Sequence, residues 1–191
     1  MKLILASGSP YRKQLLERLQ IPFGVSAPGI DESPHAGELP QALAIRLSRS
    51  KAQAVAAAEP HSVVIGSDQV ASLDATHPIG KPGTLANARR QLAAASGRTM
   101  FFYTAFAMVA PGHPLIEHCV PVAVAFRTLT SREIDRYLAL EQPFDCAGAA
   151  KCEGLGIALL SSIRTDDPTA LIGLPLILLS EALRQVGLSA I

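Results

Sequence analysis

The feature that most constrains the fold of this chain lies in its first twelve residues. A short apolar run of β type, residues 2–6, meets the sequence Ser-Gly-Ser-Pro-Tyr-Arg, which starts at Ser7. This pattern predicts a strand followed by a helix, with Ser9 as the N-cap and Pro10 at the first helical position, where its missing N–H is no loss. Free backbone N–H groups, two hydroxyls and the guanidinium of Arg12 then converge on one spot. They predict a binding site for an anion such as phosphate.

Length and composition narrow the class of protein. The 191 residues are enough for one domain or two small lobes around a substantial core. An apolar share of 49% with 17% charged residues predicts a compact globular chain. The formal net charge of +1 argues against a binder of duplex nucleic acid, which usually carries a basic face, whereas a nucleotide needs only a local cluster of Lys and Arg.

The chain contains no segment typical of membrane attachment or of an oxidising compartment. Only four apolar residues separate Lys2 from Ser7, too few for a signal peptide. The apolar stretch 170–179 is interrupted by Gly173 and Pro175 and is shorter than the roughly 20 residues that cross a bilayer. Three cysteines without a Cys-x-x-Cys pair fit a reduced environment and give no zinc motif. We therefore expect a soluble, cytoplasmic protein.

Periodicity and turn residues predict alternating helices and strands, and hence an α/β fold with both parallel and antiparallel connections. Helices are expected at 10–19, 40–58, 85–96, 130 to about 140, and 175–186. Strands are expected at 2–6, 63–65, 100–109, 118–126 and 155–161. Thr84 is the expected N-cap of the third helix, and Thr130 and Glu133 form the pattern of a capping box. No repeat or linker divides the chain, so a single domain spanning 1–191 is expected.

Cations in the first loop favour the anion site. Serines before a helix are most often only caps, so the hydroxyls do not decide the matter. Arg12 and Lys13, however, place two positive charges in the first turn, against the helix dipole, at a local cost of up to ~1 kcal/mol. A bound negative charge would offset that cost.

Carboxylates supply the second kind of chemistry. Asp68 follows the apolar run 63–65 and the residues Gly-Ser, at the end of a strand, where α/β proteins commonly place their sites. It either caps its own turn or binds a metal or deprotonates water. The acidic pair Asp31-Glu32 is either simply solvated or, through Glu32 with Asp68, supplies oxygen ligands for a hard cation such as Mg²⁺ or Mn²⁺.

Two lysines remain open to either a surface or a binding interpretation. Lys51 sits within a predicted helix rich in alanine, where surface solvation is the default explanation. Lys81 lies in the stiff sequence Gly-Lys-Pro-Gly, where a flexible surface lysine gains little. Either ammonium would neutralise phosphate as a point charge.

Seven motifs together resemble one family, the Maf-type nucleotide pyrophosphatases. They are KLILASGSPYRK at 2–13, IDE at 30–32, SKA at 50–52, IGSDQV at 65–70, GKP at 80–82, CAGAAKCEGLG at 146–156 and LIGLP at 171–175. They occur in the order of the family and span essentially the whole chain.

The resemblance implies a fold, an activity and a set of site residues. The fold is of the inosine-triphosphate-pyrophosphatase type, an elongated mixed central sheet flanked by helices with two lobes around a cleft, often in a homodimer. The activity is hydrolysis of the α–β phosphoanhydride of a nucleoside triphosphate to the monophosphate and pyrophosphate, with Mg²⁺ or Mn²⁺. By position, Asp68 is the proton acceptor, and Glu32 and Asp68 bind the metal. The implied phosphate ligands are Ser7, Ser9, Arg12, Lys51 and Lys81.

Within the family, three residues resemble the YceF-like branch, which acts on 7-methylguanosine triphosphate: Tyr11, Gln69 and Glu153. N7 methylation makes the guanine ring cationic, so the ring of Tyr11 gains cation–π attraction and the carboxylate of Glu153 offsets charge at the base edge. Many members of that branch carry Trp at the position of Tyr11, which leaves this chain a weaker stacking surface.

Two alternatives stay open from the sequence. The same site would act on dTTP and UTP, or on another non-standard nucleotide, and a panel of nucleotides separates these substrates. A second hypothesis is not enzymatic: the chain is a non-catalytic nucleotide-binding regulator of cell division. Asp68 beside a metal site weighs against that hypothesis, because a protein that only binds a nucleotide needs no general base.

Overall fold

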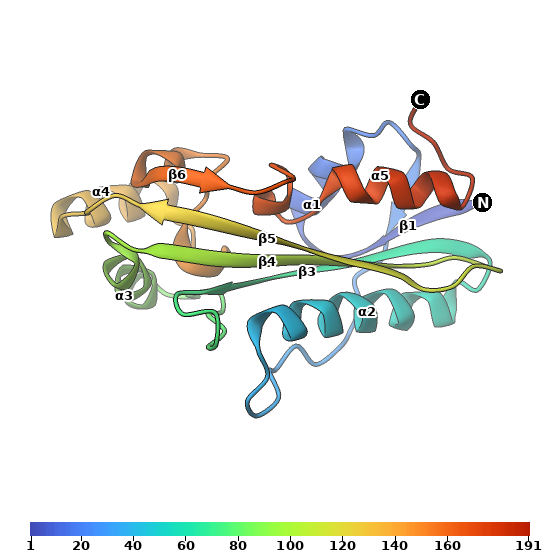
Figure 1. Ribbon diagram of the computed structural model, residues 1–191, viewed down its shortest axis with the longest axis horizontal. Helices are drawn as coiled ribbons and strands as arrows, with labels where there is room; N and C mark the ends of the chain where they lie inside the picture. Colours follow the sequence, from blue (N-terminus) through green and yellow to red (C-terminus); the bar gives the residue numbers. More distant parts are fainter.

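The structure, a computed structural model that describes residues 1–191, is organised around one six-stranded sheet of order β2-β1-β3-β4-β5-β6 (Figure 1). The strands are β1 (Lys2–Ala6), β2 (Phe23–Val25), β3 (Ser62–Ser72), β4 (Thr99–Val109), β5 (Ile116–Phe126) and β6 (Leu160–Arg164). The helices are α1 (Pro10–Glu17), α2 (Pro40–Ala58), α3 (Leu85–Ala95), α4 (Ser131–Glu141) and α5 (Leu176–Gln185). β1 pairs in parallel with β2 and β3, and the remaining pairs are antiparallel. The predicted α/β class with a mixed, elongated sheet is confirmed.

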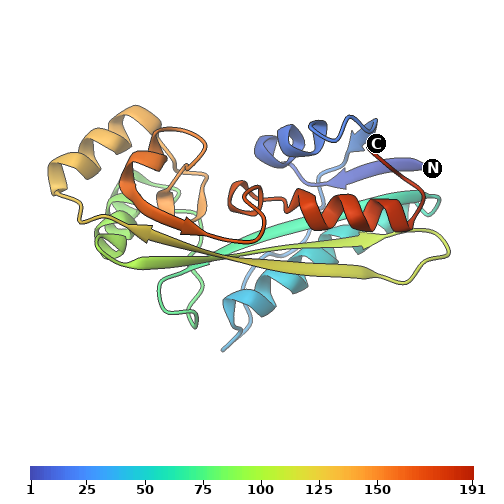
Figure 2. The ribbon, with the colours of Figure 1, turned by 45° about the horizontal axis from the view of Figure 1, so that its top comes forward.

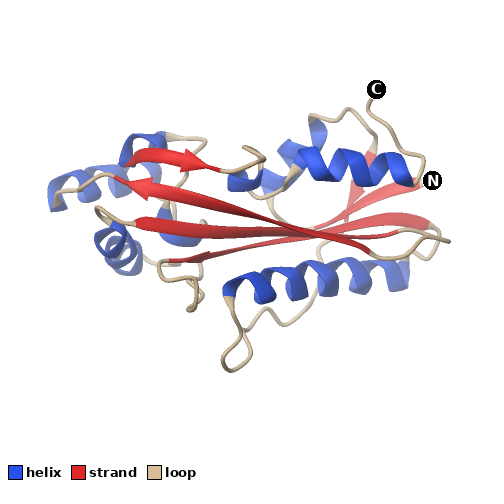
Figure 3. Cartoon of the chain, in the orientation of Figure 1, coloured by secondary structure: helices blue, strands red, loops and turns tan.

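Helices cover both faces of this sheet. α2 lies along one face, while α1 and α5 lie on the opposite face near one end (Figure 1). α4 and β6 lie at the other end of the sheet, with α3 next to α4 (Figure 2). The long strands β3, β4 and β5 run through both ends (Figure 3). No helix combines the length and the hydropathy needed to span a membrane.

The predicted helix starts are confirmed by their caps. Ser9 accepts a hydrogen bond from the Arg12 N–H at 3.4 Å, directly before Pro10 begins α1. Thr84 caps α3 in the same way. At α4, the hydroxyl of Thr130 and the carboxylate of Glu133 each accept from the other's backbone N–H, as the capping-box pattern predicts.

β1 is buried on both faces. Leu3 and Leu5 belong to the apolar cluster that includes α1 and α5, whereas Ile4 and Ala6 pack against Val55 of α2. Successive strand residues point to opposite faces, so a strand covered on both sides needs a continuous apolar run. This explains why residues 3–6 are all apolar and show no alternation of polar and apolar side chains.

Two large apolar clusters make up most of the core. One contains 19 buried residues and joins α3 and α4 to β4 and β5, with Leu92 and Leu138 among them. The other contains 15 and joins α1 and α5 to β1 and β3, with Leu15 and Leu179 among them. The two expected lobes correspond to these clusters, and the sheet is continuous between them.

Three sequence expectations differ from the structure. β3 does not end after Ile65 but continues to Ser72, because β4 pairs with it well beyond the last residue that β1 reaches, Gly66. The strand expected at 155–161 begins only at Leu160, since 155–159 form a 3₁₀ turn packed on the preceding loop. The three-residue strand β2 is too short to show a period, and the sequence analysis missed it.

Gly66 sets the distance between α2 and β3. A Cβ at this residue would lie 2.2 Å from the carbonyl oxygen of Ser48 and 2.5 Å from the backbone nitrogen of Ala52. Only glycine allows this approach of helix backbone to strand. α2 therefore carries its side chains close to the middle of β3, where the candidate site lies.

Candidate active site

A cavity of about 620 Å³ opens where β1 stops pairing with β3. Its lining comes from the loop after β1, the first turn of α1, α2 and the middle of β3. Four further loops complete it, at 27–34, 78–81, 145–153 and 171–173. Pairing between the two parallel strands ends at Ala6 and Gly66, so the chain leaves β1 at Ser7 while β3 continues. The N-terminus of α1 and the residues after Gly66 thereby line the same cavity, which has the size of a small-molecule site.

Every residue given a site role from the sequence motifs lines this cavity. These are Ser7, Ser9, Tyr11, Arg12, Glu32, Lys51, Asp68, Gln69, Lys81 and Glu153. Asp31 and Lys13 do not line it. The Asp31 carboxylate accepts from the Ser33 N–H, and Lys13 lies 3.8 Å from Glu17 on the outer surface. Of the two cations in the first turn of α1, only Arg12 therefore reaches the site.

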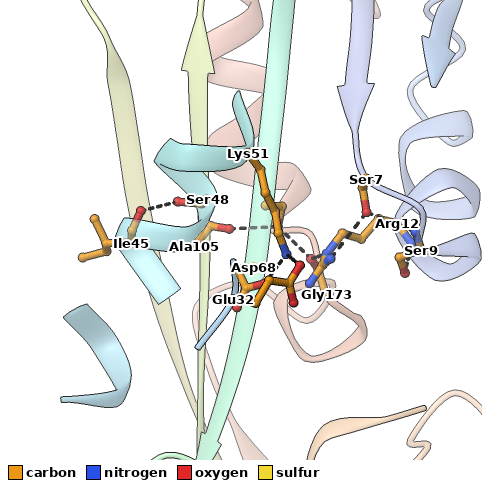
Figure 4. A network of polar contacts seen from close by, with 11 residues as sticks. Ser7, Ser9, Arg12, Glu32, Ile45, Ser48, Lys51, Asp68, Ala105 and Gly173 are labelled. Atoms are coloured by element: carbon orange, nitrogen blue, oxygen red, sulfur yellow. Dashed lines mark hydrogen bonds and ion pairs between the residues drawn. The ribbon is translucent and has the colours of Figure 1, made fainter. Parts of the chain in front are cut away.

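Lys51 lies between the carboxylates of Glu32 and Asp68 (Figure 4), and all three side chains line the cavity. Its Nζ is 2.6 Å from Asp68 Oδ1 and 2.7 Å from Glu32 Oε1. The side chains of Lys51 and Asp68 are only 6% and 10% exposed, so the surface interpretation of Lys51 is wrong. Lys51 continues the row of Leu47 and Val55 at spacings of four on the buried face of α2. A lysine in a row of buried apolar residues was the signal for this position.

The lysine also affects the ionisation of Glu32. Partial burial raises the pKa of this carboxyl. The hydrogen bond and the charge of Lys51, together with the charges of Lys81 and Arg12, outweigh that effect, so the pKa of Glu32 lies below its ordinary value. Glu32 is thus held as a carboxylate next to Asp68.

The carboxylates of Glu32 and Asp68 fit a divalent cation whose remaining ligands come from a bound substrate and water. Both carboxylates reach the same ammonium group, so their oxygens lie close together. The structure has no group of three or more His, Cys, Asp or Glu side chains arranged to hold a metal. Mg²⁺ is commonly bound through one or two carboxylates together with substrate phosphates and water, and this donor set matches that pattern.

Arg12 is fixed at the start of α1. Its Nε donates to the carbonyl of Gly173 at 2.9 Å and its Nη1 to Ser7 Oγ at 3.4 Å (Figure 4). Ser7 Oγ also accepts from the Ser9 N–H at 3.1 Å. Ser9 itself caps the helix, so the loop presents an ordered set of donors at the helix N-terminus.

A turn at 170–173 is held against the sheet by polar side chains that the sequence analysis did not single out, together with Gln69. Ser67 Oγ donates to the carbonyls of Ala105 and Gly173, at 2.8 and 3.0 Å. Thr104 Oγ1 donates to the carbonyl of Ala170 at 2.8 Å, and Gln69 Nε2 also contacts that carbonyl at 3.0 Å. Hydroxyls in the middle of apolar strands were the available signal for Ser67 and Thr104. Because the carbonyl of Gly173 also accepts from Arg12 Nε, this turn positions the guanidinium.

The opposite part of the lining comes from the loop after α4. Tyr11 donates its hydroxyl to Asp145 Oδ2 at 3.3 Å, and Lys151 Nζ lies 5.7 Å from the centre of the Tyr11 ring. Burial is the largest of the effects that raise the pKa of Glu153 above its ordinary value. The sequence analysis missed Asp145 and Lys151, because only the fold brings them to Tyr11.

A family model described as Maf-like protein matches residues 2–186 of this chain. The chain belongs to the Maf family. Among curated relatives, proteins named 7-methyl-GTP pyrophosphatase are 55% identical in Bordetella pertussis (strain Tohama I), covering 98% of this chain and 93% of that protein. In Xanthomonas oryzae pv. oryzae the identity is 54%, covering 97% of each. The solved structure of the Staphylococcus aureus Ham1 protein matches 66% of this chain and 72% of that one, with 17% identity and a TM-score of 0.46.

In this Maf family chain, the cavity has two parts of different charge. We call the part lined by Arg12, Lys51 and Lys81 the cationic end, since these cations accompany the α1 N-terminus. We call the part lined by Tyr11, Asp145 and Glu153 the aromatic end, where an aromatic ring meets two carboxylates. Lys81 is exposed at the rim, close enough to Glu32 for its charge to lower the pKa of that carboxyl.

Proposed function

We propose that this protein hydrolyses the α–β phosphoanhydride of 7-methyl-GTP, giving 7-methyl-GMP and pyrophosphate. The observation that carries the proposal is the charge distribution of one cavity. Arg12, Lys51 and Lys81 outnumber the carboxylates of Glu32 and Asp68 at the cationic end, whereas carboxylates lie beside an aromatic ring at the aromatic end. 7-Methyl-GTP has the matching distribution, because its triphosphate is anionic and its methylated base is cationic. The names of the relatives from Bordetella and Xanthomonas support the same substrate.

In the proposed reaction, water forms a bond to the α-phosphorus while the bond from that phosphorus to the bridging oxygen breaks, and pyrophosphate leaves. Asp68 accepts the proton of the attacking water. Arg12, Lys51 and Lys81 bind the phosphates and stabilise the charge that develops on the leaving group. Glu32 and Asp68 would hold Mg²⁺ or Mn²⁺, which supplies further positive charge at the phosphates.

Ser7 and Ser9 contribute by ordering the loop before α1, whose backbone N–H groups face the phosphates in this proposal. Ser7 Oγ accepts from both Arg12 and the Ser9 N–H, so it orders the loop that presents the α1 N-terminus to phosphate. Gln69 has its amide nitrogen engaged by Thr104 and the 170–171 carbonyls. We therefore assign Gln69 an indirect part in specificity, through the position of the turn that it holds.

A panel of nucleotides tests the proposal. Purified protein is incubated with Mg²⁺ or Mn²⁺ and with 7-methyl-GTP, GTP, dTTP, UTP or ITP, and monophosphate and pyrophosphate are quantified. The proposal predicts the highest kcat/KM for 7-methyl-GTP. Faster hydrolysis of dTTP and UTP, or of ITP, would overturn the substrate and keep the reaction. Tight nucleotide binding without hydrolysis would favour the non-catalytic regulator instead.

Isotope labelling tests the bond that breaks. Hydrolysis in H₂¹⁸O places the label in the monophosphate when water attacks the α-phosphorus, as proposed. Label in the pyrophosphate would show attack on the β-phosphorus and would require a different position for Asp68 relative to the substrate.

The family resemblance further implies a homodimer, a cytoplasmic location and one domain spanning residues 1–191. Light scattering coupled to size-exclusion chromatography tests the dimer directly. A mass that stays at 20.1 kDa over the accessible concentration range would contradict it.

A further inference from the structure

Asp145 is held in the cavity by neutral donors alone. Its Oδ2 accepts from the Tyr11 hydroxyl at 3.3 Å, and its Oδ1 accepts from Cys146 Sγ at 3.5 Å. Glu32 and Asp68, by contrast, are both paired with Lys51. Glu153 resembles Asp145 in that it forms no ion pair. No ion pair of the structure includes Asp145, so its charge faces the cavity without a protein cation to balance it.

The cation nearest to the Tyr11 ring is already balanced by another residue. Lys151 Nζ lies 5.7 Å from the centre of the Tyr11 ring, but it is also 3.0 Å from Glu141 Oε1. Glu141 Oε2 accepts in addition from the Leu155 N–H at 2.7 Å, which fixes the carboxylate in place. The Tyr137 hydroxyl accepts from the Lys151 N–H at 3.0 Å. Lys151 is therefore anchored to α4 and shows that the Tyr11 ring accommodates a positive charge.

The Tyr11 hydroxyl remains a donor to Asp145 at all physiological pH values. Burial, together with the neighbouring Cys146 and Asp145, raises the pKa of this phenol above its ordinary value. One aromatic side chain thus provides a ring for stacking and a hydroxyl that orients a carboxylate next to the ring.

We propose that Asp145 is a further specificity-determining residue: oriented by the Tyr11 hydroxyl, its carboxylate supplies the counter-charge for a cationic base stacked on the Tyr11 ring. This role of Asp145 rests on the proposed function, and it adds to the contributions of Tyr11 and Glu153 in distinguishing a methylated from an unmethylated guanine. Stacking on the Tyr11 ring discriminates only about fivefold, through cation–π attraction, because the two bases otherwise offer a similar π surface. A carboxylate without a protein cation attracts the cationic base more strongly than the neutral one.

The test is substrate discrimination in Asp145→Asn. The amide oxygen still accepts from Tyr11, whereas the negative charge is gone. We expect KM for 7-methyl-GTP to rise about tenfold and KM for GTP to change less than about twofold, with kcat for both near wild type. Asp135→Asn is the matched control, because Asp135 lies on α4 in an exposed ion pair with Arg89 and does not line the cavity. It should leave both KM values unchanged.

A second variant tests the same assignment independently of how Asp145→Asn folds. Tyr11→Phe keeps the ring and removes the hydroxyl that orients Asp145, so the discrimination ratio should fall by a smaller factor of about two to five. Equal losses on both substrates, or an undiminished ratio in Asp145→Asn and Tyr11→Phe, would overturn the inference and leave the proposed function standing. A wild-type protein without preference for 7-methyl-GTP would overturn the proposed function, and the inference with it.

Discussion

At the scale of single residues, the contact between Lys51 and its two carboxylates dominates the site. Burying charged groups costs several kcal/mol per ion, and well-packed apolar residues often serve stability equally well. Lys51 nevertheless occupies a row that Leu47 and Val55 fill with apolar side chains. We infer that these ion pairs serve the chemistry of the site, since Lys51 keeps Asp68 and Glu32 together where we propose that the phosphates bind.

The first prediction concerns Asp68→Asn. Turnover should fall by about 10²–10⁴, the usual contribution of a general base. The fold should persist, because the amide oxygen accepts from Lys51 and Glu32 still balances the ammonium. Steady-state kinetics and thermal unfolding check the two parts of this prediction. Wild-type kcat in the variant would exclude Asp68 as the proton acceptor.

Residue positions were more predictable from the sequence than residue contacts. Motif resemblance correctly brought together the residues that line the cavity, from Ser7 to Glu153. The outward direction of Lys13 and the bond of Tyr11 to Asp145 depend on how distant segments pack. A single sequence contains little information on such contacts, because they join residues far apart in the chain.

At the scale of elements, the approach of α2 to β3 is decisive, and Gly66 makes it possible. Gly66→Ala should lower the free energy of unfolding by about 1–3 kcal/mol, because its Cβ meets backbone atoms of α2 rather than a flexible side chain. KM should rise as well, since α2 carries Lys51.

Urea unfolding and kinetics of Gly66→Ala give both quantities. Gly29→Ala is the control, because its added Cβ meets nothing within 4 Å. Equal stability of the two variants would contradict this account of the helix–strand contact.

The α4 capping box predicts a change of stability with pH. Hydrogen bonds from Thr130, followed by Arg127, lower the pKa of Glu133 from its ordinary 4.5 to about 2. A depressed carboxyl pKa stabilises the fold above about 4.5, and this contribution is lost as pH falls through about 2. Glu133→Gln should therefore show a flatter acid limb in unfolding measurements.

Glu181→Gln provides the comparison for Glu133→Gln, because Glu181 is exposed and makes no side-chain hydrogen bond or ion pair in the structure. Parallel acid limbs in wild type and Glu133→Gln would show that the capping box contributes nothing to acid stability.

Element boundaries were predictable where local chemistry sets them. Caps at Ser9, Thr84 and Thr130 predicted the starts of three helices, since a cap acts within four residues. The length of β3 was not predictable, because it depends on the partner strand β4, whose paired residues lie 29 to 45 positions further along the chain (Ser72 pairs with Phe101, and Val64 with Val109). Gly66-Ser67 resembles a turn until that partner is known.

At the scale of the whole molecule, β3, β4 and β5 pass through both apolar clusters and link them mechanically (Figure 3). We predict one cooperative unfolding transition for both lobes. Leu92→Ala in one cluster and Leu179→Ala in the other should each lower the free energy of unfolding by about 2–5 kcal/mol. The midpoint of the single transition should fall accordingly in both variants.

Circular dichroism and residue-level hydrogen exchange in urea follow the two lobes separately. The dependence on urea should keep the wild-type slope in both variants. Two resolved transitions, with each variant shifting only one of them, would show that the lobes unfold independently and would argue against a single domain.

The central claim is that one cavity combines phosphate hydrolysis with recognition of a cationic base. Its most direct test is competition, with equal amounts of 7-methyl-GTP and GTP in one reaction and both monophosphates quantified at early times. The ratio of products gives the ratio of kcat/KM. We predict an excess of 7-methyl-GMP of at least about fivefold, as expected from cation–π attraction alone. Equal amounts of the two products, or an excess of GMP, would contradict the claim.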